Sequence, residues 1–273
     1  MNDEVISFKP HRFQSAAVHY LEGRPSYPPL LLSRVASFCR LDRTQRVLDL
    51  GCGPGQLALA LAPLAGEVTA MDPEPAMLRI AARSAADAGQ EIKLVEGSSY
   101  DLGPHLGRFD LVVIGRAFHW MDRADTLKRL DRLIEPIGAI VLFDDDFPKV
   151  PDNRWRSVFT ALTDEYAADD ADRRKRKSPD WPIHEAFLLA SPFDRLERVS
   201  VIERQQTSVE RLVDRALSMS STTADRLGER TAELADRIRQ TMAPFAVDGT
   251  IIEVVEAGAL IARRGPSDRT GAP

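Results

Sequence analysis

Short apolar runs alternate with helix-like segments between residues 46 and 146. The runs are RVLDLG, EVTAMD, IKLVEG, FDLVVIG and AIVLFDDD, at 46–51, 67–72, 92–97, 109–115 and 139–146. They are too apolar for a sheet with one solvent-exposed face, and they are typical of parallel strands that are buried on both faces. Between them, segments 56–64, 76–88 and 123–133 carry apolar residues at helical spacing, as right-handed crossover connections require. The alternation predicts a doubly wound α/β domain.

The pattern changes on both sides of this region. Before it, two prolines precede residues 30–38, which favours a short amphipathic helix that begins at a proline. After it, residues 147–190 combine aromatic residues with a cluster of charges. The remaining segments predict a strand at 193–206, helical segments at 208–219 and 224–242, and a last strand at 250–262.

The first predicted strand runs into a glycine-rich turn with the sequence VLDLGCGPGQ, at 47–56. Glycines there permit a tight turn and let the backbone approach a ligand. The dinucleotide fingerprint needs a further glycine where the chain has Gln56, so a pyrophosphate ligand is disfavoured. Asp72 ends the second strand, where its carboxylate can accept hydrogen bonds from both hydroxyls of a ribose. Together these features predict a site for a nucleoside without a diphosphate.

These segments resemble the class I S-adenosylmethionine-dependent methyltransferases, in particular the small-molecule branch known as methyltransferase type 11. The glycine turn is similar to the first motif of the family, 68–78 to its second-strand motif, and 109–122 to its fourth-strand motif. Residues 127–143 are similar to its helix and fifth strand, with Ile137 in place of a glycine. YLEGRPSYP, at 20–28, is similar to the N-terminal lid of the subgroup that includes trans-aconitate methyltransferases.

The resemblance implies the fold and the cofactor. It implies a Rossmann-like sheet of seven strands in the order 3-2-1-4-5-7-6, with strand 7 antiparallel, and a helical cap inserted after the fifth strand. The implied cofactor is S-adenosyl-L-methionine, which leaves as S-adenosyl-L-homocysteine. The chain then divides into a lid and helix at 1–40, a cofactor-binding core at 41–146, a cap at 147–192, strands and helices that complete the sheet at 193–265, and a flexible tail at 266–273.

The resemblance also implies cofactor-binding residues. Gly51 and Gly53 would pack against the methionine part of the cofactor, with Asp49 near its amino group, and Asp72 would hold the ribose. The other implied positions, around the adenine and along the methyl-donor cleft, are Pro73, Met77, Ser99, Tyr100, Arg116 and Ala117.

Candidates for the acceptor side come from the lid, the turn after the fourth strand and the cap. They are Tyr20, Tyr27, His119, Trp120, Trp155 and Trp181. His119 is the candidate general base; the alternative is that the His-Trp pair closes the floor of the cleft. Arg24 either seals the cofactor or binds an acidic acceptor, and the alternative is a surface hinge. The tryptophans at 155 and 181 either line a pocket or form the core of the cap.

The transfer chemistry needs few side chains, because the sulfonium donor is already activated and leaves as a neutral thioether. Alignment of the acceptor with the methyl group supplies most of the effect. A base is needed only for an alcohol or amine, whereas a carboxylate needs none. We expect O-methylation of a carboxylate or hydroxyl of a small organic acid or secondary metabolite.

Composition and charge limit the classes of partner that the chain is expected to bind. The chain has 273 residues, with 36 Lys or Arg and 41 Asp or Glu, for a net charge of −5. This balance gives no general attraction to a polyanion. The longest apolar run, at 57–65, is shorter than the roughly 18–20 residues of a membrane span. Cys39 and Cys52 match no disulfide framework or zinc pattern. We expect a cytoplasmic monomer or homodimer that acts on a small molecule, without nucleic acid, membrane or metal.

Two charged segments allow more than one interpretation of their function. The aspartates at 144–146 end the fifth strand on the ligand side, where solvated loop charges are favoured over a metal site. RRKRK, at 173–177, follows three acidic residues, which favours a salt-bridged helix face over a nucleic-acid contact. Docking through RRKRK would suit an RNA or protein methyltransferase, and a non-catalytic protein that binds the cofactor for regulation is the other alternative.

Overall fold

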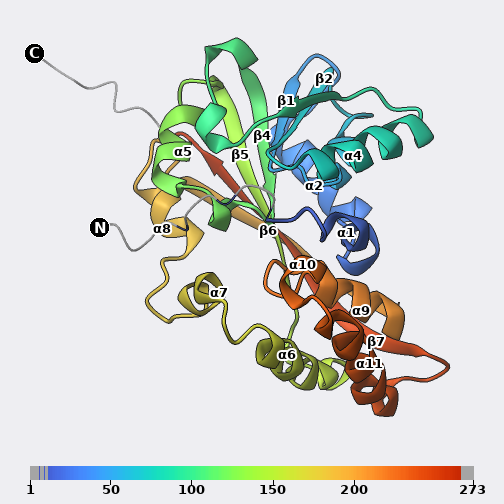
Figure 1. Ribbon diagram of the computed structural model, residues 1–273. Helices are drawn as coiled ribbons and strands as arrows, with labels where there is room; N and C mark the ends of the chain where they lie inside the picture. The colour runs from blue at the N-terminus through green and yellow to red at the C-terminus, as the bar shows by residue number, and fades with distance from the viewer. Residues whose placement is uncertain (1–5, 7–8, 10–11, 266–273) are drawn as a thin grey trace, which may run out of the picture.

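The strands of the computed structural model, which describes Ile6, Lys9 and residues 12–265, form a mixed seven-stranded sheet (Figure 1). They are β1 (Arg46–Leu50), β2 (Glu67–Asp72), β3 (Lys93–Glu96), β4 (Phe109–Gly115), β5 (Ile134–Asp146), β6 (Arg195–Ser208) and β7 (Thr250–Arg263). Their order is β3-β2-β1-β4-β5-β7-β6, and β7 runs antiparallel to both of its neighbours. The predicted fold class and strand order are therefore confirmed. The predicted tail at 266–273 lies outside the described residues.

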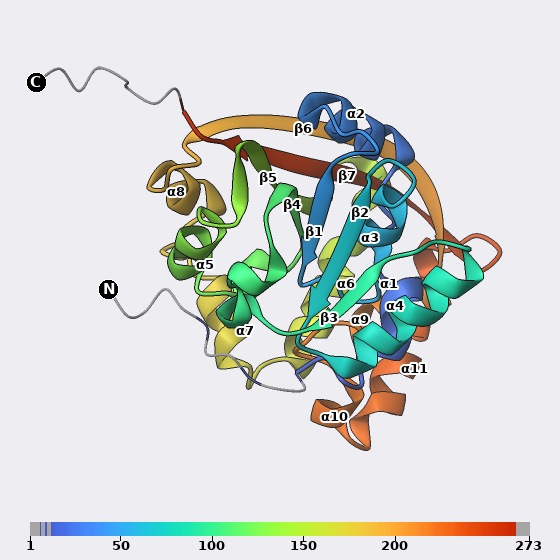
Figure 2. The ribbon, with the colours of Figure 1, turned by 90° about the horizontal axis from the view of Figure 1, so that it is seen from above.

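Helices cover both faces of the sheet and build a separate cap. They are α1 (Ala17–Gly23), α2 (Pro29–Cys39), α3 (Gln56–Leu61), α4 (Pro75–Asp87), α5 (Arg123–Leu130), α6 (Trp155–Tyr166), α7 (Ala171–Arg176), α8 (His184–Leu189), α9 (Val209–Leu217), α10 (Ala224–Leu227) and α11 (Arg230–Met242). Successive strand residues point to opposite faces. Val47 accordingly belongs to an apolar cluster with side chains of α2 and α3, and Leu48 to one with side chains of α5 and α8. Figure 2 shows these two groups of helices on opposite sides of the sheet.

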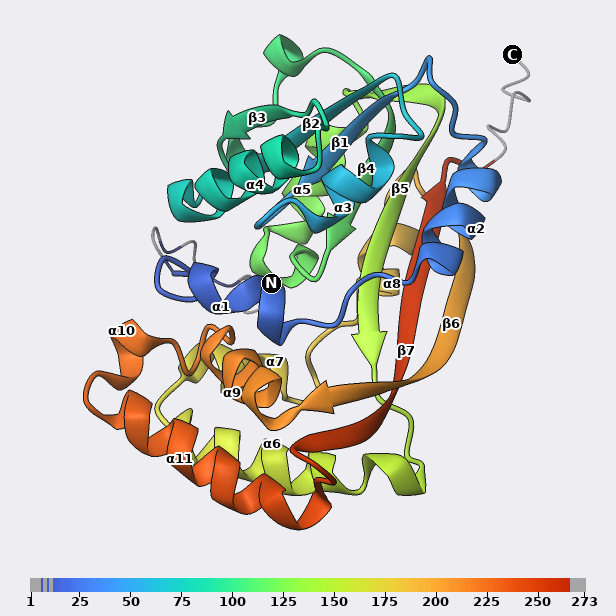
Figure 3. The same ribbon diagram turned by 90° about the vertical axis from the view of Figure 1, so that its right-hand side faces the viewer.

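The cap has an apolar core of its own, which joins α6, α9 and α11. The antiparallel pair β6–β7 carries it: β7 pairs with β5 only as far as Glu256, but continues to pair with β6 down to Thr250. Figure 3 shows this strand pair curving away from the sheet toward these helices. Two of them, α9 and α11, lie in the connection between the two strands, and α11 packs on both α9 and α6.

Two local features differ from the sequence patterns. The helical period over 224–242 predicts one segment, but Gly228 adopts a left-handed φ of +57° and separates α10 from α11. Ile137 lies inside β5 and is 90% exposed, near a register shift between Phe109 and Leu111. A side chain at this position therefore projects into solvent and does not disturb the sheet.

The lid helix α1 packs closely on α9 of the cap. Gly23 permits this approach, because a Cβ atom at that position would lie 2.5 Å from the backbone nitrogen of Arg215. Among the helices of the described part of the chain, none combines the length and the apolar character needed to span a bilayer.

Candidate active site

A cavity of about 890 Å³ lies between the carboxyl ends of the central strands and the cap. Its volume falls within the range of about 300–1,000 Å³ that is usual for small-molecule sites. Open α/β sheets bind ligands at this edge, outside the strand ends. The residues that line it on the strand side include Leu50, Gly51, Gly53, Asp72, Pro73, Met77, Ser99, Tyr100, Arg116 and Ala117.

The glycine turn after β1 forms one wall of the cavity. Gly51 and Gly53 have left-handed φ values of +72° and +54°, which glycine adopts without strain. A Cβ at position 51 would lie 2.8 Å from the Cβ of Ala117, whereas a Cβ at position 53 would meet no atom within 4 Å and would face open space. The backbone at Gly53 is therefore free for close approach by a ligand.

Asp72 is held in place by the backbone of that turn. One carboxylate oxygen accepts a hydrogen bond from the Gly53 nitrogen at 2.8 Å, and the other accepts one from the Glu74 nitrogen at 2.8 Å. Burial raises the pKa of Asp72 to about 6. Each carboxylate oxygen retains acceptor capacity, so the group suits two hydroxyl donors of a ribose.

Asp49 lies beneath the turn and does not itself line the cavity. Its Oδ2 atom accepts a hydrogen bond from the Ala58 nitrogen at 2.9 Å, while its buried Oδ1 atom has no partner among the described residues. Burial raises the pKa of Asp49 to about 7. Two buried carboxylates with raised pKa values favour a positively charged ligand, and S-adenosylmethionine, with its sulfonium and ammonium groups, fits this requirement.

The predicted adenine positions come together in the same cavity. Met77 and Ser99 are buried, Pro73 follows β2, and Tyr100 is 42% exposed at the rim. Ser98 caps the short helical turn that carries Ser99 and Tyr100. Contacts of these four residues with an adenine ring stay a prediction.

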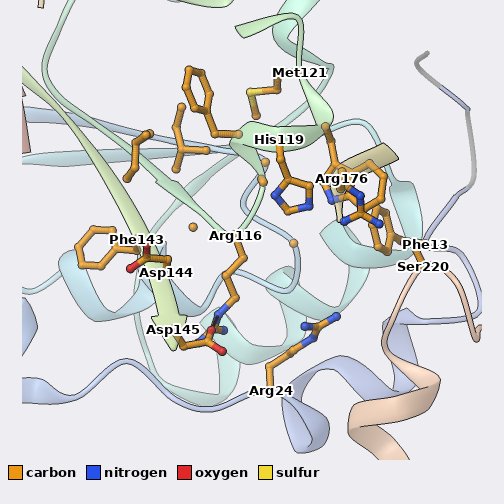
Figure 4. A pocket seen from close by; sticks show the side chains of 18 of the residues that line it. Phe13, Arg24, Arg116, His119, Met121, Phe143, Asp144, Asp145, Arg176 and Ser220 are labelled. Carbon is orange, nitrogen blue, oxygen red and sulfur yellow. Dashed lines mark hydrogen bonds and ion pairs between the residues drawn. The ribbon is translucent and has the colours of Figure 1, made fainter. Parts of the chain in front are cut away.

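Arg116 connects the end of β4 with the lid and with β5. It has a left-handed φ of +55°, and its side chain forms an ion pair with Asp145 and donates a hydrogen bond to the Pro25 carbonyl at 2.8 Å. Figure 4 shows Arg116 pointing toward Asp145, with Arg24 beside them. Tyr27 lies outside the cavity lining, where its ring centroid is 4.5 Å from the Arg116 guanidinium. The structure thus places Tyr27 as support for Arg116 and not among the residues that an acceptor can touch.

The lid contributes Tyr20 and Arg24 to the cavity lining. Arg24 donates a hydrogen bond to the Ser218 carbonyl at 3.0 Å, and its guanidinium lies 5.3 Å from the Tyr20 ring centroid. The lid is therefore attached to the loop that follows α9.

His119 and Trp120 follow β4 and also line the cavity. The pKa of His119 is lowered well below its usual value, first by burial and then by the positive charge of Arg176. A histidine in these surroundings is neutral and a weak base. Trp120 stacks between two guanidinium groups, with Arg12 at 4.4 Å and Arg176 at 4.0 Å from the ring centroid.

The two cap tryptophans have different positions. Trp181 lines the cavity. Trp155 is 1% exposed, packs on Phe159 and donates a hydrogen bond from its indole nitrogen to the Ile252 carbonyl at 3.2 Å. Of the two alternatives for Trp155, the structure favours the core of the cap, because the side chain belongs to the apolar cluster of α6, α9 and α11 and does not line the cavity.

The charged segments are largely engaged within the protein. Arg173 and Lys177 of the RRKRK segment both pair with Asp164, as a salt-bridged helix face requires. In the acidic run at 144–146, Asp145 pairs with Arg116. No group of three potential metal ligands occurs within residues 12–265 and the two described positions before them.

The sequence patterns missed several cavity residues from the cap. They are Phe147, Arg156, Phe159, Arg215 and Ser220. Long-range packing brings them to the site, because the segment that carries the first three and the segment that carries Arg215 and Ser220 are more than 50 residues apart in the chain. The sequence held one signal for Arg215, which interrupts the apolar face of its helix. In the structure this arginine forms a buried ion pair with Glu253 of β7 at 2.8 Å.

Comparison with known proteins supports the same interpretation. Residues 47–138 match a family described as methyltransferase domain. An uncharacterized methyltransferase of Mycobacterium tuberculosis is 28% identical over 85% of both chains. The demethylmenaquinone methyltransferase of Thermus thermophilus is 36% identical, over 42% of this chain and 53% of that protein.

The fold also recurs in solved structures. A methyltransferase from Thiobacillus denitrificans, in complex with S-adenosyl-L-homocysteine, matches with a TM-score of 0.53 and 19% identity, over 95% of this chain and 100% of that one. At this identity the match shows a shared fold only. The matched domain and the relatives above are similarities of sequence. The matched domain, the relatives and the strand order all support a class I S-adenosylmethionine-dependent methyltransferase.

Proposed function

We propose that this methyltransferase methylates an oxygen of a small organic acid that binds between the strand ends and the cap. Gly51, Gly53 and Asp72 would hold the cofactor on the strand side of the cavity, with Asp49 contributing negative charge from beneath the turn. When bound, the cofactor supplies an electrophilic methyl group. The cap side of the same cavity is then left for the acceptor.

The observation that carries this proposal is the environment of His119. Burial and the surrounding arginines lower its pKa, so it is poorly suited to remove a proton from an alcohol or amine. Positive surroundings instead favour an acceptor that is already an anion at neutral pH. A carboxylate meets both conditions.

The proposed reaction balances without a base. A carboxylate oxygen uses its own electron pair to form the bond to the methyl carbon, and the pair of the broken carbon–sulfur bond stays on sulfur. The products are a methyl ester and S-adenosyl-L-homocysteine, and no proton is released. Alignment of the acceptor with the methyl group in the cavity supplies the rate enhancement.

The test is methyl transfer from S-adenosylmethionine labelled in its methyl group, with a panel of small carboxylic acids and the corresponding alcohols. Methyl esters hydrolyse in base and release labelled methanol, whereas methyl ethers and methylamines do not. We expect base-labile label with one or more acids. Label that resists base would contradict ester formation, and so would transfer to alcohols alone.

A further inference from the structure

Four arginine side chains from separate elements line the cavity where the cap meets the ends of β4 and β5. Arg24 comes from the lid, Arg116 from the turn after β4, Arg156 from α6 and Arg215 from α9. Burial lowers the pKa of Arg24 and that of Arg156, and neighbouring charges lower both further: Arg116 and Arg215 act on Arg24, and Arg215 acts on Arg156. We call these four residues the arginine cluster.

Two members of the cluster form ion pairs within the protein. Arg215 forms a two-point ion pair with Glu253, at 2.8 and 2.9 Å, and Arg116 pairs with Asp145. Within the described residues, Arg24 and Arg156 have no ion-pair partner. Asp144 and Asp146 also line the cavity, but neither forms an ion pair with these two guanidinium groups.

Three of these side chains also hold hydrogen-bond donors that lack a partner. The donors are Arg24 Nε, Arg116 Nη1 and Arg156 Nη1, all buried and without an acceptor among the described residues. A buried charged donor without a partner is unfavourable by more than a neutral one. An anion that settled among them would remove this penalty.

Arg156 is fixed for such a contact by its aromatic neighbours. Its guanidinium lies 3.1 Å from the ring centroid of Phe147 and 5.5 Å from that of Trp155. Stacking restrains the plane of a guanidinium and leaves its edge free for a two-point contact with a carboxylate. Burial lowers the pKa of Arg156 to about 10, so the group still carries its charge at neutral pH.

We infer that the arginine cluster is the subsite that recognises the acceptor's carboxylate, with Arg156 as a specificity-determining residue. This inference rests on the proposed function. The cluster selects an acid over its neutral analogues, because a neutral group leaves the buried donors without a charged partner. Methylation removes the charge, so the ester product binds more weakly than the acid and leaves the site.

The experiment measures binding of paired probes to protein saturated with S-adenosyl-L-homocysteine. The probes are acetate, phenylacetate and octanoate, each with its amide and its methyl ester, titrated by calorimetry. We compare the natural chain with Arg156→Met, and with Arg154→Met as the matched control. Arg154 precedes the same helix, is exposed and does not line the cavity, so its replacement removes one charge without altering the subsite.

The natural chain and Arg154→Met should bind at least one acid about tenfold or more tightly than its amide and ester. Arg156→Met should lose that preference, and Arg156→Lys should retain part of it. The affinity for S-adenosyl-L-homocysteine reports on whether each variant is folded. Equal affinity for acid and amide in the natural chain, including no binding of either, overturns the inference, as does a preference that survives in Arg156→Met.

Failure of the proposed function has a different signature. An acid that binds through Arg156 but never receives labelled methyl would reject the methylation and leave the subsite in place. Methyl transfer to an acid that binds equally well in Arg156→Met would reject the subsite and leave the reaction.

Discussion

At the residue scale, the roles of individual side chains follow from what surrounds them. Asp49 and Asp72 are carboxylates that the turn buries, His119 is a histidine that burial and then neighbouring arginines keep neutral, and Arg116 is fixed by an aspartate and a carbonyl. The position of Asp72 was predicted from the end of the second strand, and the role of Asp49 was implied by the family resemblance. The environment of His119 was not predicted, because Arg176 and Arg24 reach it from distant segments.

Asp49 should make the stability of the free protein depend on pH. Its pKa in the folded protein is about 7, above the unfolded value, so its contribution is present at low pH and is lost as the pH rises toward that value. We expect Asp49→Asn to raise the Tm of the free protein relative to the natural chain at about pH 8, and to raise it by clearly less at about pH 5. Thermal melts across this range measure it. An equal effect at both pH values would contradict the assignment.

His119 should be dispensable as a base. If the acceptor is a carboxylate, His119→Gln lowers kcat less than about tenfold, whereas loss of a general base lowers rates by about 10²–10⁴. The profile of kcat for the natural chain should also be flat from about pH 6 to about pH 9. A loss above about a hundredfold in the variant, together with a titrating profile, would identify His119 as a base.

At the element scale, the strands and most helices were predictable because their sequence periods are clear. β1, β2 and β4 lie where the apolar runs predict them, to within a residue. The break between α10 and α11 was missed, since the helical period continues through Gly228. The apolar core that α6 shares with α9 and α11 was also missed, because an amphipathic face does not specify its partner.

The contact of α1 with α9 should depend on Gly23. We expect Gly23→Ala to destabilise the protein by about 1–3 kcal/mol, because the added methyl group meets backbone atoms that have no room to move. Denaturant unfolding measures this, with Ser26→Ala as a control at an exposed position of the same lid. A variant as stable as the natural chain would show that the lid does not pack as described.

At the scale of the whole molecule, one buried ion pair links three distant parts of the chain. Arg215 of α9 binds Glu253 of β7 through two nitrogens, and its Nε atom donates a hydrogen bond to the Gly23 carbonyl of the lid at 3.0 Å. The pair therefore links the lid, α9 of the cap and β7 beside the cavity.

Replacing one residue of the Arg215–Glu253 ion pair should strongly destabilise the protein. We expect Glu253→Gln to destabilise the protein by about 3–5 kcal/mol, because Arg215 is left buried without a counter-charge. The double variant Arg215→Met with Glu253→Leu should recover much of this loss. Urea unfolding of the single and double variants measures their free energies of unfolding, and the difference between them shows whether the two residues are coupled. If both variants lose the same stability, the ion pair is not the link.

The measurement that tests the central claim most directly is a calorimetric titration of S-adenosyl-L-homocysteine into the natural chain, Asp72→Ala and Asp87→Ala. Asp87 is an exposed carboxylate at the end of α4 and serves as the matched control. The account predicts one binding site in the natural chain and in Asp87→Ala, and an affinity at least about tenfold weaker in Asp72→Ala, since the ribose loses a charged acceptor. Equal affinity in Asp72→Ala and the natural chain would contradict the assignment of this crevice as the cofactor site.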